Sequence, residues 1–554
     1  MTTTIATDVL IAGGGPCGLM LALELGRRGI NVLLVDEKPD TAFNPQANAT
    51  QARTMEHFRR LGFADEVRAL GLPGDYPTDI AYFTRFSTHE LARLSLPAAK
   101  DATRIIKGLG GSWSAAELPH RVSQKFVERV LRQKADALPS TDIRYSWRLE
   151  HFADTGEHVT AAITSVTTGE RIDVHSRYLV GADGPRSLVR ETLGIRYAGG
   201  TGTTRDFMGG RMCAVYAKAP DFYARFPHRR AWMHMTLNKD RRCLLAAVNG
   251  RDEFAFHTQL RAHEPEAAVT DPDARRMFAQ AMGCPIDIEV LSRAFWTAGH
   301  ALYAETFQRG RVFIGGDAAH LFTPTGGLGY NTAVEDAVNL GWKLAAVIKG
   351  QGGDGLLESY ARERVPLAKR NTGYARAFAD SLGLITAPDC LEDNSDEGRA
   401  ARATAGAYLD NHARTEFNIP GVTFGGRYDD SNIIASDGTA PPPDTANAYV
   451  PTACPGGRPP HMWLDDATSL YDRFGPEWTL LRLSPNAGGE RLARAFADRG
   501  INLATCDVDR PDLRDLYEAD LALIRPDQIV AWRGSDRSSD PSAIVKRVLG
   551  LGTT

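Results

Sequence analysis

The sequence predicts an α/β protein in which a first domain, built on a parallel sheet, is interrupted by a sheet-rich segment and followed by a second, smaller α/β domain. Three observations lead to this prediction. Residues 8–35 alternate strand, helix and strand. The strand-then-helix pattern returns after a long gap at residues 311–348. A further alternation begins near residue 449, beyond a stretch rich in Gly and Pro. The first domain is therefore expected to consist of two separate pieces of chain.

Length and composition limit the classes of protein that the chain could represent. Its 554 residues correspond to three or four domains at roughly 150 residues each, or to one large domain with inserted lobes and a tail. The 64 Lys and Arg residues nearly balance the 68 Asp and Glu residues, and 43% of the residues are apolar. This composition excludes disorder along the whole chain. It also argues against a nucleic-acid partner, because the net charge of −4 offers no basic surface for phosphates.

We expect neither a signal peptide nor a membrane-spanning segment. No apolar run approaches the ~20 residues that span a bilayer, and the N-terminus lacks the positively charged start of a signal peptide. The seven cysteines are scattered, odd in number and never spaced as CxxC. This pattern fits neither a disulfide framework nor a zinc site. We therefore expect a cytoplasmic protein without a metal.

The first element is a strand at 8–12 that leads through Gly13-x-Gly15-x-x-Gly18 into a helix at 16–28. In such a turn the first glycine permits the bend, the second lets the backbone approach a diphosphate, and the third lets helix and strand pack closely. The next strand, 32–35, ends at Asp36, which is placed to accept hydrogen bonds from a ribose. Residues 8–36 thus predict a dinucleotide site.

Two later motifs have the same strand-to-turn character. Helices are expected at 53–61 and 123–137, and a strand at 177–180 ends in Gly181-Ala182-Asp183-Gly184. Residues 200–300 read as strand-rich and could form a sheet that covers a ligand. A strand at 311–315 then precedes Asp317, and a Pro- and Gly-rich loop leads into a helix at 331–348. The positive end of that helix would favour a developing negative charge.

These elements define the expected domain boundaries. Composition shifts toward Gly, Pro, Asp and Asn between 390 and 460, with a triple proline at 441–443. The first domain is expected to comprise residues 1–185 and 301–390, with some strands of the inserted domain within 75–120. The inserted domain spans 186–300. A linker or extended region is expected at 391–445 and the last domain at 446–554.

The segments GGGPCG, GADGPRS and GGDAAHLFTPTGGLGYN together resemble the class A flavin-dependent aromatic monooxygenases, the single-component hydroxylases related to p-hydroxybenzoate hydroxylase and phenol hydroxylase. The resemblance covers roughly residues 5–385. It implies a Rossmann-like FAD-binding domain interrupted by a substrate-binding domain. FAD would be the cofactor, NAD(P)H and O₂ the co-substrates, and a homodimer the assembly. No second GxGxxG exists, so NAD(P)H would dock transiently.

The resemblance assigns roles to individual residues. Asp36 would meet the adenosine ribose, Asp317 the ribityl or diphosphate region, and Tyr330 with Asn331 the flavin ring through their backbone. Gln124 would reach the flavin side, and Asp183 would belong to a site shared by FAD and pyridine nucleotide. The full expected cofactor set is Gly13, Gly15, Pro16, Cys17, Gly18, Asp36, Glu37, Gln46, Arg53, Gln124, Asp183, Gly316, Asp317, Pro324, Gly327, Gly329, Tyr330 and Asn331. Cys17 would serve there as a small apolar filler.

The chain departs from the family pattern at two positions. Relatives usually carry an arginine where this chain has Gln46, and a basic residue often stands where it has Glu37. Neutralisation of the diphosphate would then depend more on the helix end and the backbone. Arg53, one helix later, could compensate, although an exposed helix arginine is the commoner case.

The last domain resembles the thioredoxin-like domain of the phenol hydroxylase branch. Thioredoxin chemistry needs two cysteines in a Cys-x-x-Cys arrangement, and this segment has only Cys454 and Cys506, far apart in the sequence. We therefore expect a structural or interface role for this domain.

The resemblance implies that reduced FAD captures O₂ as a C4a-hydroperoxide and transfers its distal OH to a small phenolic substrate. Water must be kept away from that intermediate, and the loop from Pro324 would lie beside the reacting edge. The candidates to bind or deprotonate the phenol are His234 and Tyr223, with Trp296 and Tyr303 as further candidates, although ordinary packing is the commoner role for each of these residue types in such a position. His320 is interpreted as structural.

Three alternatives stay open from the sequence. The substrate could be a larger polyketide- or antibiotic-like aromatic. The protein could be a halogenase relative, although the expected Trp-x-Trp-x-Ile pattern is absent, or a non-catalytic FAD or aromatic-ligand sensor. Esterase, zinc protease and P-loop ATPase motifs are missing.

Overall fold

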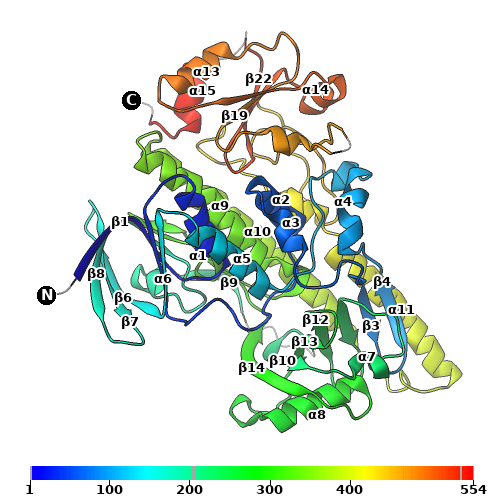
Figure 1. Ribbon diagram of the computed structural model, residues 1–554. Helices are drawn as coiled ribbons and strands as arrows, with labels where there is room; N and C mark the ends of the chain where they lie inside the picture. The colour runs from blue at the N-terminus through cyan, green and yellow to red at the C-terminus, as the bar shows by residue number, and fades with distance from the viewer. Residues whose placement is uncertain (1–2, 202–206, 466, 537–539, 553–554) are drawn as a thin grey trace.

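The computed structural model describes residues 3–201, 207–465, 467–536 and 540–552. Its first layer is an eight-stranded sheet with the central order β16-β17-β8-β1-β2-β5 (Figure 1). The bounds of its strands are β1 Thr3–Ala12, β2 Val32–Asp36, β5 Thr141–Tyr145, β6 Trp147–Asp154, β7 Val159–Ser165, β8 Arg171–Gly181, β16 Gln308–Arg309 and β17 Val312–Ile314. Strand β17 pairs in parallel with β8, so the two pieces of chain complete one sheet as predicted.

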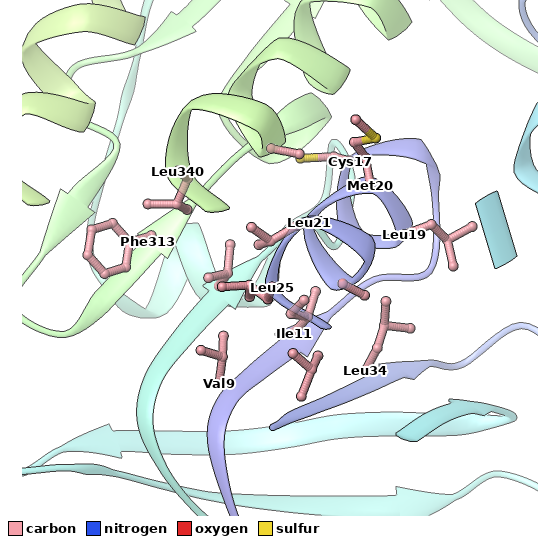
Figure 2. Close-up of a cluster of buried hydrophobic side chains, with 14 of the residues drawn as sticks. Val9, Ile11, Cys17, Leu19, Met20, Leu21, Leu25, Leu34, Phe313 and Leu340 are labelled. Carbon is pink, nitrogen blue, oxygen red and sulfur yellow. The ribbon is translucent and has the colours of Figure 1, made fainter. Parts of the chain in front are cut away.

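Three helices bury their apolar residues against this sheet and against one another. They are α1 Pro16–Gly26, α5 Gln124–Asp136 and α9 Gly329–Ile348. In Figure 2, Leu21 and Leu25 of α1 lie between Ile11 of β1 and Leu340 of α9. Strand β1 reads as a continuous apolar run from Val9 onward because both of its faces are covered there. This layer holds the Gly-rich turn rigidly.

The inserted domain is built on a seven-stranded sheet with the order β14-β10-β13-β12-β11-β3-β4. Its strands are β3 Ile80–Phe83, β4 Glu90–Leu94, β10 Gly210–Lys218, β11 Met233–Thr236, β12 Cys243–Ala247, β13 Glu253–Gln259 and β14 Glu289–Ala298. Only the β11–β3 pair is parallel. Strands β3 and β4 come from the early part of the chain, as expected for residues 75–120.

The two faces of this sheet have different surroundings. The outer face carries Leu245 and Phe256, both fully buried, and is covered by α8 Asp271–Met282 and α7 Phe222–Arg225. The inner face carries Tyr216 and Ser292, whose side chains hydrogen-bond to Lys125 of α5 and to Asn44. The inner face is therefore turned toward the first domain.

The expectation of an extended linker at 391–445 is wrong for its first half. Residues Asp396–Phe417 form helix α11 and Pro420–Phe424 form α12. Ser395 caps α11 by accepting a hydrogen bond from the Gly398 amide. The helix then buries Leu409 among the residues of the seven-stranded sheet core. Gly406 lets α11 lie close to β4, since a Cβ at this position would stand 2.3 Å from the Leu91 carbonyl oxygen.

The C-terminal domain is a four-stranded sheet with the order β20-β19-β21-β22, drawn in orange and red in Figure 1. Its elements are β19 Thr479–Arg482, α13 Glu490–Ala497, β20 Ala504–Asp507, α14 Pro511–Tyr517, β21 Leu521–Ile524, β22 Val530–Gly534 and α15 Pro541–Val548. Strand β19 is parallel to β20 and antiparallel to β21, which agrees with the predicted thioredoxin-like α/β arrangement. Cys454 and Cys506 are both free thiols and buried.

The remaining elements connect these layers. A three-stranded sheet of order β18-β15-β9 lies beside α10. The bounds are α2 Ala52–Arg60, α3 Ala64–Arg68, α4 Ala99–Lys107, α6 Leu188–Thr192, β9 Tyr197–Gly200, β15 Ala301–Ala304, β18 His320–Phe322 and α10 Asp354–Leu384. Among the described residues, no helix has both the length and the apolar composition needed to cross a membrane.

Candidate active site

The first glycine motif forms a turn in which each glycine has a different neighbour. A Cβ at Gly13, where φ is +110°, would lie 2.1 Å from the Ala182 carbonyl oxygen, and one at Gly18 would lie 1.9 Å from the Gly13 carbonyl oxygen. Neither residue can carry a side chain without moving backbone. A Cβ at Gly15 would meet nothing within 4 Å. The turn therefore leaves open space where the N-terminus of α1, with Pro16 as its first residue, can receive a diphosphate.

Asp36 fixes this turn through hydrogen bonds to the backbone. Its Oδ2 accepts a hydrogen bond from the Gly14 amide at 2.7 Å, and its Oδ1 accepts one from the Lys38 amide at 2.8 Å. Tyr145 donates its hydroxyl to the Gly14 carbonyl at 2.8 Å. Glu37, the next residue, is exposed. The carboxylate of Asp36 is thus positioned by backbone on two sides of the turn.

The third motif lies directly against the first. Cys17 is buried, and its Cβ would be 3.0 Å from a Cβ at Gly316. Gly316 itself is held by Asp336 of α9, whose Oδ2 accepts from the Gly316 amide at 3.1 Å and pairs with His320 Nε2 at 2.6 Å. Asp317 follows Gly316 with its side chain exposed. Cys17 and Gly316 are thus neighbours across the two pieces of chain, and His320 lies in a buried pair with Asp336.

A buried arginine keeps the carboxylate of Asp336 ionised. Arg364 Nε lies 2.7 Å from Asp336 Oδ1, and both side chains are fully buried. Burial alone would raise the pKa of Asp336, but His320 and Arg364 together lower it below its usual value. The charge on Asp336 can therefore hold the Gly316 amide over the whole neutral range.

The loop from Pro324 to Asn331 is tied to residues 49–54 by side-chain amides. Asn331 Oδ1 accepts from the Gln51 amide at 2.8 Å and from Thr54 Oγ1 at 2.7 Å, while its Nδ2 donates to the Gly327 carbonyl. Gln51 Nε2 donates to the Gly326 carbonyl at 2.8 Å. Asn331 thus acts through its side chain inside the protein, in addition to the backbone role that the resemblance implied.

This loop presents its glycines and proline beside the start of α9. Gly326 and Gly327 have φ values of +67° and +63°, which favour glycine. Pro324 is exposed at the start of the loop, and Gly329 begins α9. Tyr330 places its hydroxyl 3.3 Å from Thr50 Oγ1. The loop is therefore held rigidly with its Pro324 end free to face a ligand.

Gln124, Gln46 and Asp183, three other predicted cofactor residues, differ in exposure and in their contacts. The backbone N–H of Gln124 donates to the Ala47 carbonyl at 2.7 Å, so the start of α5 lies beside the segment that carries Gln46. The side chain of Gln46 is exposed. Asp183 accepts from Ser187 and from the Val189 amide, so it closes the turn before α6. Burial raises the pKa of Asp183.

Arg53 does not serve as a substitute for the missing arginine at position 46. Its guanidinium donates to the carbonyl oxygens of Asp527 and Gln528 at 2.9 and 3.1 Å and forms an ion pair with Glu56 at 3.0 Å. The side chain is buried between α2 and the C-terminal domain. The sequence alone could not predict this partner, because it lies more than 470 residues after Arg53.

The contacts of His234 and Tyr223 do not support the catalytic roles expected for them. His234 lies on the outer face of the seven-stranded sheet, fully buried among Phe83, Phe222 and Phe226, and burial lowers its pKa to about 3. Tyr223 of α7 hydrogen-bonds to Tyr76 and packs on Phe254 of the same face. Both side chains are separated from the first domain by the sheet.

The inner face carries polar residues that the sequence did not single out. Tyr82 and His257 lie there, together with Trp296, which was one of the further candidates for a contact with the phenol. Tyr303, the other candidate, lies on β15 opposite His320. The signal that could have found Tyr82 and His257 is the two-residue alternation of their strands, once the register of the sheet is known.

Comparisons with known proteins agree with this geometry. Residues 6–375 match a family model described as "FAD binding domain", and residues 452–551 match "Aromatic-ring hydroxylase, C-terminal". Phenol 2-monooxygenase from Pseudomonas sp. is 29% identical, covering 99% of this chain and 93% of its own length. Aklavinone 12-hydroxylase from Streptomyces purpurascens is 31% identical, with 98% of each chain covered.

A solved structure of the rebeccamycin biosynthetic enzyme RebC with reduced flavin has a TM-score of 0.88 and 33% identity, covering 99% of this chain and 100% of that one. The open space at Gly15 and the exposed Asp317 fit an FAD diphosphate. The chain therefore belongs to the FAD-dependent aromatic-ring hydroxylases, and it is a flavoprotein monooxygenase that consumes NAD(P)H and O₂.

Proposed function

We propose that this monooxygenase hydroxylates a phenolic aromatic compound bound between the inner face of the seven-stranded sheet and the Pro324–Gly329 loop. The observation that carries the proposal is a group of inner-face residues that are not fully buried. Ala214, Leu244 and Met233 on the inner face are half-buried, whereas Val215 and Leu245, their neighbours on the outer face, are at most 1% exposed. An apolar surface that faces the cofactor motifs and stays partly accessible suits an aromatic ring.

Gly15 and Asp317 would hold FAD, which when reduced by NAD(P)H would supply the activation of O₂. The residues of the chain bind, orient and dehydrate the reactants. The Pro324–Gly329 loop restricts water near the reacting edge, while the N-terminus of α9 offers its positive end to negative charge on the ring system. The apolar inner face keeps the substrate ring in position without competing hydrogen bonds.

Substrate-stimulated turnover tests the proposal. The yellow holoenzyme is mixed with NADH or NADPH, O₂ and a panel of phenols, and the products are identified by mass spectrometry. We expect stimulated cofactor oxidation together with addition of one oxygen atom to a phenol. A sensor would give no stimulated oxygen uptake with any compound, and a halogenase would need chloride and a separate flavin reductase.

A second candidate is a hydroxylase of larger polycyclic aromatics. It is favoured by the breadth of the accessible inner face, which extends over several strands, and by the names of two of the similar proteins, an aklavinone hydroxylase and a rebeccamycin biosynthetic enzyme.

Light scattering on the purified protein tests the homodimer that the family resemblance implies.

A further inference from the structure

The turn of the β21–β22 hairpin is buried between the C-terminal domain and the FAD-binding domain. Residues 521–530 are all buried, and Asp527 and Gln528 in the turn are 4% and 2% exposed. Gln528 has a φ of +56°, a left-handed conformation that is unfavourable for a residue with a side chain. Loops usually lie at the surface of a protein. A buried, polar and strained turn therefore indicates a specific contact with its neighbours.

This turn bonds to two helices of the FAD-binding domain. Arg53 of α2 donates from Nη1 to Gln528 Oε1 at 3.1 Å, and from Nη2 to the carbonyl oxygens of Asp527 and Gln528 at 2.9 and 3.1 Å. Asn339 of α9 donates from Nδ2 to Asp527 Oδ2 at 3.2 Å. Two residues of the turn thus bridge α2 and α9.

The same two helices hold the Pro324–Asn331 loop at their N-terminal ends. Thr54, the residue after Arg53, donates its hydroxyl to Asn331 Oδ1 at 2.7 Å. Asn331 in turn donates from Nδ2 to the Gly327 carbonyl at 2.6 Å. A continuous series of contacts therefore leads from Gln528 through α2 to the loop that we place against the flavin.

Close packing does not set the distance between the helices at this point. A cavity of about 50 Å³ lies where α2, α9 and the turn meet, and Thr54, Asn331, Asn339 and Asp527 are among the residues that line it. Protein interiors are otherwise packed with few voids larger than a water molecule. The hydrogen bonds to the turn therefore fix the relative position of α2 and α9 here.

The turn is itself held firmly by buried charges. Arg525 pairs with Glu363 of α10 at 2.7 Å and with Asp527 at 2.6 Å, and all three side chains are at most 3% exposed. A turn anchored to α10 in this way can hold α2 and α9 in place, whereas a freely moving turn could not.

We propose that Gln528 and Arg53 are positioning residues for the bound flavin. The turn of the C-terminal domain holds α2 and α9 so that the Pro324–Asn331 loop and the N-terminus of α9 stay close to the ring. The positive end of a helix acts only over its first turn, so a small displacement weakens its effect on the negative charge of reduced flavin. The inference goes beyond the proposed function, because it concerns the cofactor and holds for any aromatic substrate.

Two variants test the contact from its two sides. Arg53→Lys keeps a positive charge beside Glu56, but an ammonium group cannot replace the fork of the guanidinium. Gln528→Gly removes the side-chain acceptor and suits the left-handed backbone. We expect each variant to weaken the binding of oxidised FAD at least fivefold, the lower end of couplings between sites. Titration of the FAD-free full chain with FAD, followed by flavin fluorescence, measures this affinity.

The midpoint potential of the bound flavin gives a readout that a merely structural contact would not move. We expect reduced FAD to lose about fivefold more affinity than oxidised FAD, since the helix end acts on the charge of the reduced ring. For a two-electron couple, at about 30 mV per tenfold change, this lowers the potential by about 20 mV. Reductive titration of the holoenzyme against a reference dye measures it.

A double variant and a matched control complete the set. Arg53 and Gln528 act through one contact, so Arg53→Lys combined with Gln528→Gly should lose no more FAD affinity than the stronger single variant. The control is Glu518→Gly in the same domain. Glu518 also has a positive φ, +53°, but its side chain is 64% exposed and pairs with Arg533. This variant should leave FAD affinity and midpoint potential unchanged.

The coupling must also act in the opposite direction, because an interaction between two sites is mutual. FAD binding to the wild-type chain should therefore slow backbone hydrogen exchange in peptides that cover residues 521–530. Peptides that cover residues 511–518, at the far side of the same domain, should exchange at the same rate with and without FAD.

An unchanged midpoint potential or unchanged FAD affinity in Gln528→Gly overturns the inference, even where the free energy of unfolding falls, because the contact would then serve folding alone. Additive losses in the double variant, or equal exchange of residues 521–530 with and without FAD, do so as well. Should Arg53→Lys fail to fold, Gln528→Gly and the exchange measurement decide the question, since neither alters a buried charge.

Discussion

At the residue scale, Gly15 and Gly18 separate cofactor binding from folding within one turn. Gly15→Val places a side chain in the open space of the turn, where a Cβ meets no atom within 4 Å. We expect FAD affinity to fall at least tenfold, about 1.4 kcal/mol, while the thermal midpoint of the FAD-free protein stays unchanged. Flavin absorbance after desalting measures the first quantity and calorimetry of the apoprotein the second.

Gly18→Ala is the matched comparison. Its Cβ would lie 1.9 Å from the Gly13 carbonyl oxygen, so the helix and turn must separate, and we expect the apoprotein to lose about 2 kcal/mol or more of folding free energy. Should Gly15→Val lower the apoprotein midpoint as much as Gly18→Ala does, the open space at Gly15 would be a packing requirement and not a cofactor cradle.

Single residues were predictable from the sequence where local backbone geometry dictates them. Gly13, Gly18 and Asp36 are required by a strand–turn–helix unit, and that unit is visible in about 30 residues of sequence. His234 and Arg53 depend on tertiary structure instead. A strand residue faces one side or the other according to sheet register, and the partner of a helix arginine can come from any part of the chain.

At the element scale, helix α11 shows why the segment after residue 390 could not be predicted as helical. Its apolar residues are alanines apart from Tyr408, Leu409 and Phe417, and most of its support comes from the sheet that it covers. Strong apolar runs, as in β1 and β2, fix their own type. The early strands and helices were therefore predicted to within a few residues, whereas α11 needed its neighbours.

Leu409→Ala tests this support. Leu409 is 1% exposed, and truncating such a leucine typically costs about 2–5 kcal/mol. We expect that loss in urea unfolding, with FAD still bound to the native protein because the first domain is unaltered. The control is Thr404→Ala on the exposed side of α11, which should change stability by less than about 0.5 kcal/mol. Equal stability of both variants would favour a loosely attached segment.

At the scale of the whole molecule, the C-terminal domain is held to the FAD-binding domain by buried charges. Glu56 of α2 pairs with Arg458 at 2.6 Å and with Arg53 at 3.0 Å, and all three side chains are at most 6% exposed. Arg53 also bonds to the backbone of Asp527 and Gln528. In Figure 1 the orange and red domain lies above α2 and α9. The domain is thus packed on the FAD-binding domain through buried ion pairs and hydrogen bonds.

Burial would raise the pKa of Glu56, but Arg458 and Arg53 lower it from 4.5 to about 2. Because the pKa of Glu56 is lower in the folded than in the unfolded state, its ionised carboxylate stabilises the fold at pH values above 4.5. This stabilisation is lost as the pH falls from 4.5 toward 2. At about 1.4 kcal/mol per pKa unit, the full contribution is about 3 kcal/mol. Glu56→Gln should therefore lower the urea-unfolding free energy by about that amount at pH 7, and the difference from wild type should shrink below pH 4.5.

The control variant is Glu477→Gln, which removes the 41% exposed partner of Arg28 at the same interface. This change should lower the free energy of unfolding by at most about 1 kcal/mol. A Glu56→Gln deficit that is as large at pH 3 as at pH 7 would mean that the packing of this side chain, and not its charge, holds the two domains together.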